Sequence, residues 1–409
     1  MAEGTPDVAA LKQAVCSAVD QMAPRLIALS HRIHENPEFQ YEEHKASAWL
    51  CEFLNEEGLG AELGACGMPT AFAGGRDGKA PGPTVAFIAE YDALRGLGHA
   101  CGHNILGTSN AGAAAALARV MPQLAGRMRI YGTPAEEGGG GKIPFVREGM
   151  FRDVDAAISM HPGGGARPNS LGGRCLASQK VTFKYHGRPA HAAGNPHDGI
   201  NALDACIQTF NGINALRQHL RQEVRIHGII RHGGTAANVT PDFAQAEFAV
   251  RAPTTPECRE VYQKVLRCAE GGAAAAGARL EVVEGPFYEE TNPNGALGGA
   301  AMANMEALAL PVVAPSGGVA SHSTDLGNVS RVVPTVSVNI NIAGKGIQPH
   351  QHEFAVAAAS ADGDRAVVAA AKVMAMTAID VLTDPALRQR AAEEFRASMA
   401  AEQAAAAAG

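Results

Sequence analysis

Two segments of this 409-residue sequence combine side chains that can bind a divalent metal ion and move a proton. Cys101 and His103 are separated by a single glycine, so a thiolate and an imidazole can lie in one tight loop. Glu136 and Glu137 are adjacent and precede four glycines. Neighbouring carboxylates usually point in different directions, so one can bind a metal while the other acts as a base.

Two further segments carry histidine. His161 follows an apolar run, and His350 and His352 flank Gln351 in a later loop. Each of these patterns is weak alone, since a single histidine or an acidic turn is more often structural. Together they are informative, because each follows a strand candidate and the carboxyl ends of parallel strands meet at one edge of a sheet. Thiolate, imidazole and carboxylate together suit Zn, Mn, Co or Ni, and two such cations can activate water and polarise an acyl oxygen.

The apolar pattern predicts the elements that position these loops. Strands are expected at 84–89, 128–132, 156–160 and 335–340, and helices at 7–35, 42–58, 109–120 and 355–408. The first strand ends at Glu90-Tyr91-Asp92. Strands that alternate with helices predict an α/β fold with a mixed, mostly parallel sheet. The 47 glycines follow no fixed period and gather in the loops, which disfavours a repeat protein.

The pattern changes between residues 178 and 291. Alternating runs at 181–185, 244–250 and 279–283 predict strands, and 199–219 and 256–277 predict helices. This α+β segment interrupts the α/β pattern, which resumes after it. We therefore expect a discontinuous catalytic domain, 1–177 with 292–409, and an inserted domain, 178–291.

Longer motifs resemble the M20 metallopeptidase/amidohydrolase family. The similarity is greatest to its amidohydrolase branch, which includes aminobenzoyl-glutamate hydrolase subunits, N-acyl-amino-acid hydrolases and β-alanyl dipeptidases. The resemblance covers nearly the whole chain and is carried by residues 31–38, 99–103, 132–137, 187–192, 238–241 and 323–330.

This resemblance implies two divalent metal ions per subunit. The ligands that it implies are Cys101, His103, Glu137, His161 and His350. It also implies that Glu136 is the general base and that Asp92 orients a ligand.

The inserted segment resembles the lid and dimerisation domain of the family, which implies a homodimer or higher homo-oligomer. His191 resembles the histidine that a partner subunit supplies to the scissile group. Asn238 and Arg251 match substrate-contacting positions, with Arg251 a candidate for binding a carboxylate. The structural alternatives are that His191 caps a turn and that Arg251 forms an ion pair on the outside of a strand.

The sequence departs from the family pattern at several positions. Peptidase branches begin the site with His-x-Asp, whereas Glu90 stands first here, so Glu90 is not predicted as a ligand. His350 and His352 compete for the last ligand position, and the surrounding motif favours His350. His322 is a substrate-binding candidate whose alternative is simple packing.

The leading prediction is a metal-dependent hydrolase of amide-type C–N bonds in N-acyl or aryl-acyl amino acids or dipeptide-like small molecules. The alternative is an aminohydrolase that releases ammonia from an amine or aryl amine at the same site. A Cys101 nucleophile with His103 as base is disfavoured, because two residues in one glycine turn rarely hold that geometry. A binding subunit without activity is disfavoured by the intact Glu136-Glu137 pair.

Composition excludes other classes. The 34 Lys+Arg against 41 Asp+Glu give a net charge of −7 without a basic cluster, which argues against nucleic acid and acidic membranes as partners. A hydrophobic content of 46% excludes global disorder. No signal peptide or long apolar span is visible, and the 8 cysteines form no CxxC pair, so we expect a cytoplasmic enzyme with a small-molecule substrate.

Overall fold

The computed structural model describes residues 7–165, 168–314 and 318–408, which form two compact units. The first unit comprises the described residues of Met1–Arg174, Thr291–Gly318 and Asp325–Gly409. The second comprises Cys175–Glu290 and Val319–Thr324. The sequence pattern predicted boundaries at 177/178 and 291/292 and assigned 319–324 to the catalytic domain. A segment this short has no periodicity that could reveal which unit it joins.

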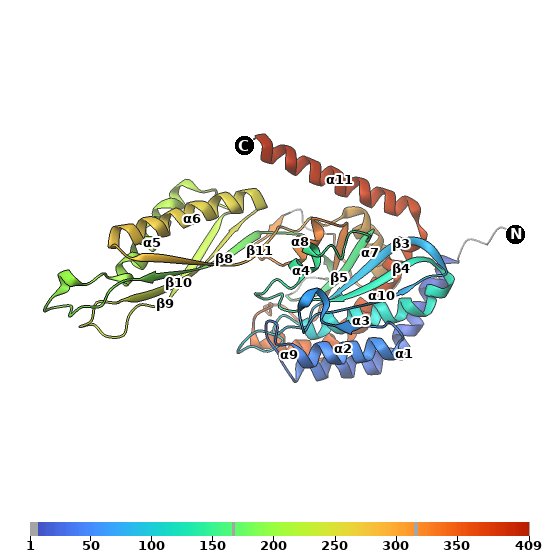
Figure 1. Ribbon diagram of the computed structural model, residues 1–409. Helices are drawn as coiled ribbons and strands as arrows, with labels where there is room; N and C mark the ends of the chain where they lie inside the picture. The colour runs from blue at the N-terminus through green and yellow to red at the C-terminus, as the bar shows by residue number, and fades with distance from the viewer. Residues whose placement is uncertain (1–6, 166–167, 315–317, 409) are drawn as a thin grey trace. The chain divides into compact units, whose positions relative to one another are not determined.

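The first unit is built around a seven-stranded sheet of order β1-β2-β4-β3-β5-β13-β6 (Figure 1). Its central strands are mutually parallel and comprise β4 (Ala125–Gly132), β3 (Ala80–Ala89), β5 (Ala156–Gly163) and β13 (Thr335–Asn341). The outer strands pair antiparallel and comprise β1 (Glu62–Leu63), β2 (Phe72–Asp77) and β6 (Ser170–Leu171). The predicted mixed, mostly parallel α/β sheet is thereby confirmed.

Helices cover both faces of this sheet, which explains why β3 and β5 each contain a continuous buried stretch. One face packs against α3 (His103–Val120) and α10 (Ala361–Thr383), and α1 (Val8–His34) packs on both helices. The other face packs against a cluster that includes Phe145 of α4 (Lys142–Arg147) and Val329 of α8 (Leu326–Ser330). The remaining helices of the unit are α2 (His44–Glu56), α7 (Gly295–Ala307), α9 (His352–Ala358) and α11 (Pro385–Ala408).

Helix α10 is apolar and long enough to span a membrane by composition alone, and it is the one such helix in the described residues. However, 72% of its most apolar window is buried inside the protein. Ser360 caps its N-terminus by accepting hydrogen bonds from the backbone N–H groups of Asp362 and Gly363. Such extensive burial identifies α10 as a helix of the protein core.

The second unit is a four-stranded antiparallel sheet of order β11-β8-β10-β9 with two helices on one face (Figure 1). Its strands are β8 (Ala177–His186), β9 (Arg225–His232), β10 (Phe243–Ala252) and β11 (Arg279–Tyr288), and its helices are α5 (Ala202–Leu216) and α6 (Thr255–Ala276). Burial alternates along β10, because one side of the sheet packs on the helices. A separate two-stranded pair joins β12 (Val319–Ala320) to β7 (Arg174–Cys175).

Several elements differ from the sequence prediction, among them α3, the last helical stretch and β9, and others such as β2 and α7 were not predicted at all. Helix α3 begins at His103 rather than at 109, and nearly all of its residues are buried, so it has no amphipathic stripe to mark its start. The expected helix 355–408 is three helices, interrupted at Ala359-Ser360 and at Asp384. Strand β9 was not predicted, because seven of its eight residues are exposed and its apolar pattern does not alternate.

Candidate metal centre

Cys101, His103 and His161 form the first group of metal-binding atoms. Their candidate ligand atoms all lie within 4.8 Å of one another, and Cys101 Sγ lies 3.4 Å from His161 Nε2. Gly102 has a φ of 76°, and a Cβ at this position would lie 2.8 Å from Pro162 Cγ. Glycine therefore permits both the left-handed turn and the close approach of the loop that carries His161.

Cys101 also belongs to a second group, with Glu137 and His350, whose ligand atoms again lie within 4.8 Å of one another. His350 Nε2 lies 3.5 Å from Glu137 Oε1. The backbone N–H of His350 donates to Ala100 O at 2.8 Å, which ties its loop to the cysteine loop. His350 has a φ of 69°, a strained conformation for a histidine that is typical of functional positions.

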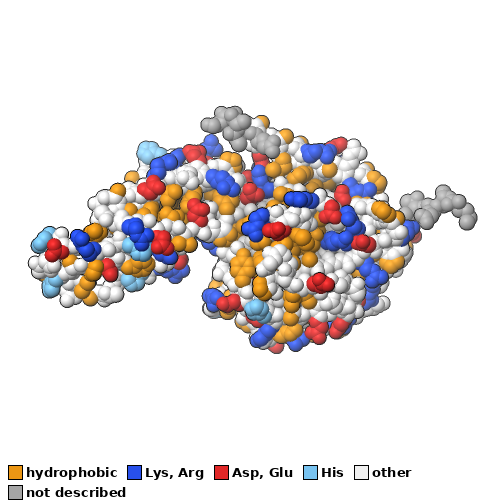
Figure 2. All heavy atoms as spheres, viewed as in Figure 1, with side chains coloured by type: hydrophobic (Ala, Val, Ile, Leu, Met, Phe, Trp, Pro, Cys, Tyr) orange, Lys and Arg blue, Asp and Glu red, His pale blue; other side chains and the backbone are white. Residues whose placement is uncertain are grey.

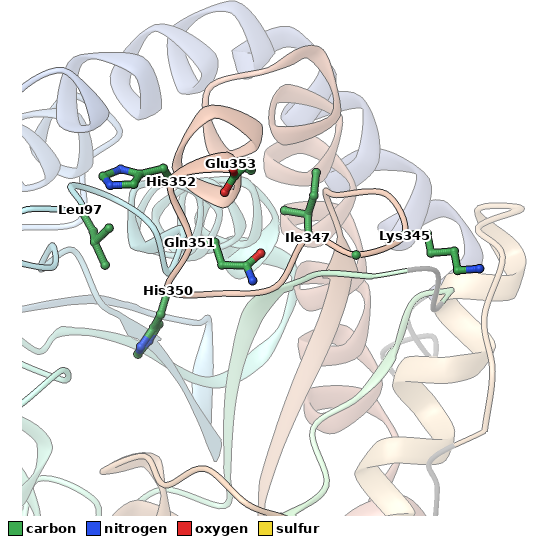
Figure 3. Close-up of a pocket in the computed structure, with 8 residues that line it drawn as sticks. Leu97, Lys345, Ile347, His350, Gln351, His352 and Glu353 are labelled. Carbon is green, nitrogen blue, oxygen red and sulfur yellow. The ribbon is translucent and has the colours of Figure 1, made fainter.

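The close-up in Figure 3 separates the two competing histidines. A cavity of about 610 Å³ beside His350 is also lined by Leu97, Lys345 and His352. The imidazoles of His350 and His352 point to different sides of their loop. His350 belongs to a donor group, and His352 belongs to none found among the described residues.

Asp92 connects the two groups by contacting one residue of each on the side away from the donor atoms. Its Oδ1 lies 2.9 Å from His103 Nδ1, and its Oδ2 accepts the backbone N–H of Glu137 at 2.9 Å. His161 Nδ1 lies 2.8 Å from Pro162 O, so in both histidines the Nδ1 atom is engaged and Nε2 faces the donors. Such outer contacts fix the ring orientation that a metal ligand needs.

The Glu136-Glu137 loop is held by its own backbone. Ala135 has a φ of 60°, and its carbonyl accepts hydrogen bonds from the N–H groups of Gly139 and Gly140. The buried Glu43 accepts the N–H of Ala135 through Oε1 at 2.9 Å. A Cβ at Gly139 would collide with the ring of Tyr41, so the loop requires glycine there.

The two adjacent carboxyl groups have opposite acidities. Burial, reinforced by the charges of Glu137 and Glu90, raises the pKa of Glu136 well above its ordinary value. Burial also opposes ionisation of Glu137, but a hydrogen bond with His350 and the charge of His103 outweigh it and lower the pKa of Glu137 to about 2. Carboxyl groups whose pKa values are pushed apart in this way suit a proton carrier and a ligand, respectively.

The donor chemistry fits a divalent cation. His103 Nε2 is fully buried and makes no hydrogen bond within the described residues, although it lies among the donor atoms. Burial, with the charge of Glu137, raises the pKa of the Cys101 thiol well above its ordinary value. A bound cation would stabilise the Cys101 thiolate and so lower the pKa of the thiol. It would also accept the lone pair of His103 Nε2, which would give this buried atom a partner.

A third cluster was missed by sequence reasoning. Glu90 Oε2 lies 3.5 Å from His103 Nε2, and Glu90, His103 and Glu136 form a further group with ligand atoms within 4.8 Å. The buried Lys142 ammonium lies 2.8 Å from Glu90 Oε1 and 2.5 Å from Asp325 Oδ1. Asp325 lies in a motif that resembles the family, but no spacing in the sequence pairs it with Lys142.

The remaining predicted residues lie in the second unit and belong to none of these donor groups. His191 is exposed, and its Nδ1 accepts the N–H groups of Ala193 and Gly194, so it does cap a turn. Asn238 is also exposed, and its backbone carbonyl accepts the N–H of Ala192.

Arg251 and His322 lie on neighbouring parts of the same unit. Arg251 Nη1 donates to Ser321 O at 3.4 Å and to Ser323 Oγ at 3.3 Å. His322 Nε2 lies 3.1 Å from Cys175 Sγ. The two residues are thus connected through the segment 321–323, which the sequence pattern assigns to the other domain.

A parallel α/β sheet with thiolate, imidazole and carboxylate donors beside a carboxyl group of raised pKa defines a metal-dependent hydrolase. Residues 81–379 match the model of Peptidase family M20/M25/M40. The chain belongs to this family, and it is a metal-dependent amidohydrolase or dipeptidase acting on amide-type C–N bonds. The predicted family and enzyme class are therefore confirmed.

Individual relatives are similar over almost their full length. The Xaa-Arg dipeptidase of Homo sapiens is 35% identical over 427 residues, covering 98% of this chain and 95% of its own. A p-aminobenzoyl-glutamate hydrolase chain of Escherichia coli is 29% identical over 454 residues, covering 93% of each chain. The crystal structure of a dinuclear metal-binding M20 peptidase from Bacillus subtilis has a TM-score of 0.63 at 24% identity and covers 89% of this chain and 99% of its own, which shows the fold.

Proposed function

We propose that this enzyme hydrolyses the amide bond of dipeptides or N-acyl amino acids that carry a free carboxylate, with Glu136 as the general base. The observation that carries the proposal is the pair of donor groups that share Cys101, next to a carboxyl group that is not a member of either. The similarity to an Xaa-Arg dipeptidase over nearly the whole chain supports a dipeptide as the substrate.

The proposed cofactor is a pair of divalent ions per subunit, chosen from Mn, Zn, Co and Ni. Cys101, His103 and His161 would hold one ion, and Cys101, Glu137 and His350 the other. When bound, such ions lower the pKa of a coordinated water and polarise the substrate's acyl oxygen.

The chain's own residues then divide the work. Glu136 accepts the proton of the attacking water and returns it to the departing amine, a role that suits its raised pKa. Asp92 holds His103 in one orientation and positions the Glu137 backbone. His191 donates to the oxyanion that forms at the acyl carbon, as the family resemblance implies.

Residues of the second unit are proposed to select the substrate. The Arg251 guanidinium is a fixed positive charge that suits a carboxylate. Ser321 and Ser323 hold it in place through the contacts described above. Asn238 and His322 are proposed as further polar contacts.

We further propose a homodimer in which strand β9 contributes to the interface. This strand is at the edge of its sheet, and Ile229 and Ile230 on it are 50% and 43% exposed. An open strand edge with exposed apolar side chains favours pairing with a second copy.

A cytoplasmic location without nucleic-acid or membrane partners is also proposed. All eight cysteines are free thiols, as is usual in a reducing compartment. Acidic and basic side chains are intermixed over the face seen in Figure 2, and this face shows no broad basic surface for an anionic polymer or bilayer.

The experiment combines metal analysis with substrate screening. The purified enzyme is expected to contain two equivalents of divalent metal, to lose activity with a chelator and to regain it with Mn²⁺ or Zn²⁺. The screen includes dipeptides ending in Arg or Lys, N-acetyl amino acids and p-aminobenzoyl-glutamate, each beside its C-terminal amide. Full activity in excess chelator would overturn the proposed metal dependence. Equal turnover of the free-acid substrates and their C-terminal amides would overturn the proposal that Arg251 binds the substrate carboxylate.

Product analysis distinguishes the two reaction classes. Amide hydrolysis releases an amino acid, whereas the alternative aminohydrolase reaction releases ammonia. Ammonia formed in step with substrate loss would replace the proposed reaction with that alternative.

A further inference from the structure

A buried ion network lies directly behind His103. Lys142 contacts Glu90 Oε1 and Asp325 Oδ1 through its ammonium group, and its backbone N–H donates to Asp325 Oδ2 at 3.0 Å. The Lys142 and Asp325 side chains are completely buried, and that of Glu90 is 3% exposed. The lysine ammonium group therefore contacts Oε1 of Glu90 and leaves Oε2 available for another contact.

That second oxygen faces a ring nitrogen. Glu90 Oε2 and His103 Nε2 lie 3.5 Å apart, and neither makes a hydrogen bond within the described residues. Two buried polar atoms left in this state are costly unless something else binds them. Ligands about 2.0–2.2 Å from one ion stand roughly 3–3.5 Å from each other, so the spacing suits two ligands of a shared cation.

The charge balance supports the same conclusion. Glu90 and Asp325 place two carboxyl groups against one buried ammonium group, and a buried charge needs a partner. One lysine balances only one of the two carboxylates when both are ionised. A divalent cation beside Glu90 would balance the remaining charge.

We propose that Glu90 supplies a carboxylate oxygen to the metal ion bound by Cys101, His103 and His161, and that Lys142 is the positioning residue that holds Glu90 there. This inference rests on the proposed metal site and extends its ligand set. Lys142 acts through Glu90, because its ammonium group fixes Oε1 and so aims Oε2 at the cation. The Asp325 carboxylate in turn holds Lys142 by accepting hydrogen bonds from both the ammonium group and the backbone N–H of that lysine.

The test measures metal affinity, not only activity. Glu90→Gln keeps the shape of the side chain but removes its charge, and Lys142→Met keeps most of the length without the ammonium group. Each is expected to weaken binding of one of the two Mn²⁺ or Zn²⁺ ions by about 10–100-fold in a chelator competition, the usual effect of losing a supporting group. The absorption spectrum of the Co²⁺-substituted protein should change in the same two variants.

The double variant decides whether the two residues act together. If Lys142 acts through Glu90, the combined loss of affinity equals that of Glu90→Gln alone instead of the sum. Additive losses would overturn the positioning role. Unchanged metal affinity and an unchanged Co²⁺ spectrum in Glu90→Gln would overturn the whole inference, even if Lys142→Met does not fold.

Matched controls remove similar groups from helix packing. Lys12→Met deletes a partly buried lysine paired with Asp380, and Glu57→Gln deletes a carboxylate paired with Arg25 and Arg119. Both are expected to lower thermal stability without changing metal affinity. A wild-type protein that binds no divalent metal would refute the proposed function itself, which separates that failure from failure of this inference.

Discussion

The two units hold their functional candidates in different ways. In the first unit, Asp92 and His103 are completely buried and bonded to each other at the end of a parallel sheet. In the second unit, His191 and Asn238 are exposed, and their described contacts are with neighbouring turn residues. The first unit is therefore preorganised for a cation, whereas the residues of the second are available for a ligand or another subunit.

This difference indicates a division between chemistry and recognition. When one member of a buried, mutually bonded group is replaced by a similar side chain, the remaining members keep their geometry. The effect of the substitution is therefore seen in the reaction rate or in metal binding. Exposed polar groups gain most of their effect when a ligand or partner orders them. Substitutions in the two units should therefore differ both in what they change and in how much.

The largest effect is expected for the adjacent carboxylates of the first unit. Glu136→Ala should lower kcat by about 10²–10⁴-fold, because the proton acceptor is lost, while both metal ions remain bound. Glu137→Ala is the matched change one residue away, and it should release metal. Activity assays and metal analysis of the two variants give this comparison directly, and metal loss from Glu136→Ala would reassign Glu136 as a ligand.

A smaller effect is expected for His191 of the second unit. His191→Ala should lower kcat by about 10²–10³-fold, the usual cost of removing one oxyanion donor, without loss of metal. If the partner subunit supplies this histidine, a heterodimer of Glu136→Ala and His191→Ala subunits contains one intact site. The differently tagged, co-expressed heterodimer should then recover about half of the wild-type rate. An inactive heterodimer would show that His191 does not act across subunits.

The smallest effect concerns stability in acid. Glu57 of the first unit is partly buried, but hydrogen bonds from Arg119 and Arg25 outweigh burial and lower its pKa. Its ion pairs therefore stabilise the fold fully above the ordinary pKa of 4.5, and this stabilisation is lost as the pH falls through the lower folded-state value. Glu57→Gln should cost about 0.5–1 kcal/mol at pH 7 and less with falling pH, as measured by denaturant unfolding.

Glu281 of the second unit provides the contrast. Hydrogen bonds from Lys184 and His186 lower its pKa, although its side chain is 38% exposed, compared with 10% for Glu57. Because water screens such a pair, Glu281→Gln should change stability less than Glu57→Gln at every pH. A larger effect at Glu281 would contradict the view that the first unit holds the stronger polar contacts.

The four parallel strands were predictable, because each contains a mainly apolar stretch that ends at a polar loop, although β4 also carries Arg127 and Arg129 and β13 carries Ser337 and Asn339. The start of α3 was not, since a helix buried on all sides carries no periodic signal. The division of the last helical stretch was missed for a related reason. Alanine-rich sequence continues across Ser360, whose capping role depends on its conformation.

The same limit applies to the site. Cys101, His103 and the Glu136-Glu137 pair were found because reactive side chains lie close together in the sequence. Glu90 and Lys142 were not assigned roles, because a buried lysine becomes meaningful only when the fold brings two carboxylates to it. Long-range charge pairing leaves no local pattern.

The chain passes between the two units at 174/175, 290/291, 318/319 and 324/325. A simple insertion would require only two such passages. A protease cut at any one of them would therefore leave the second unit covalently attached to the first by the others. Excising 175–290 alone would also leave β12 without its partner residue Cys175, so a minimal catalytic fragment must be redesigned at 319–324 as well.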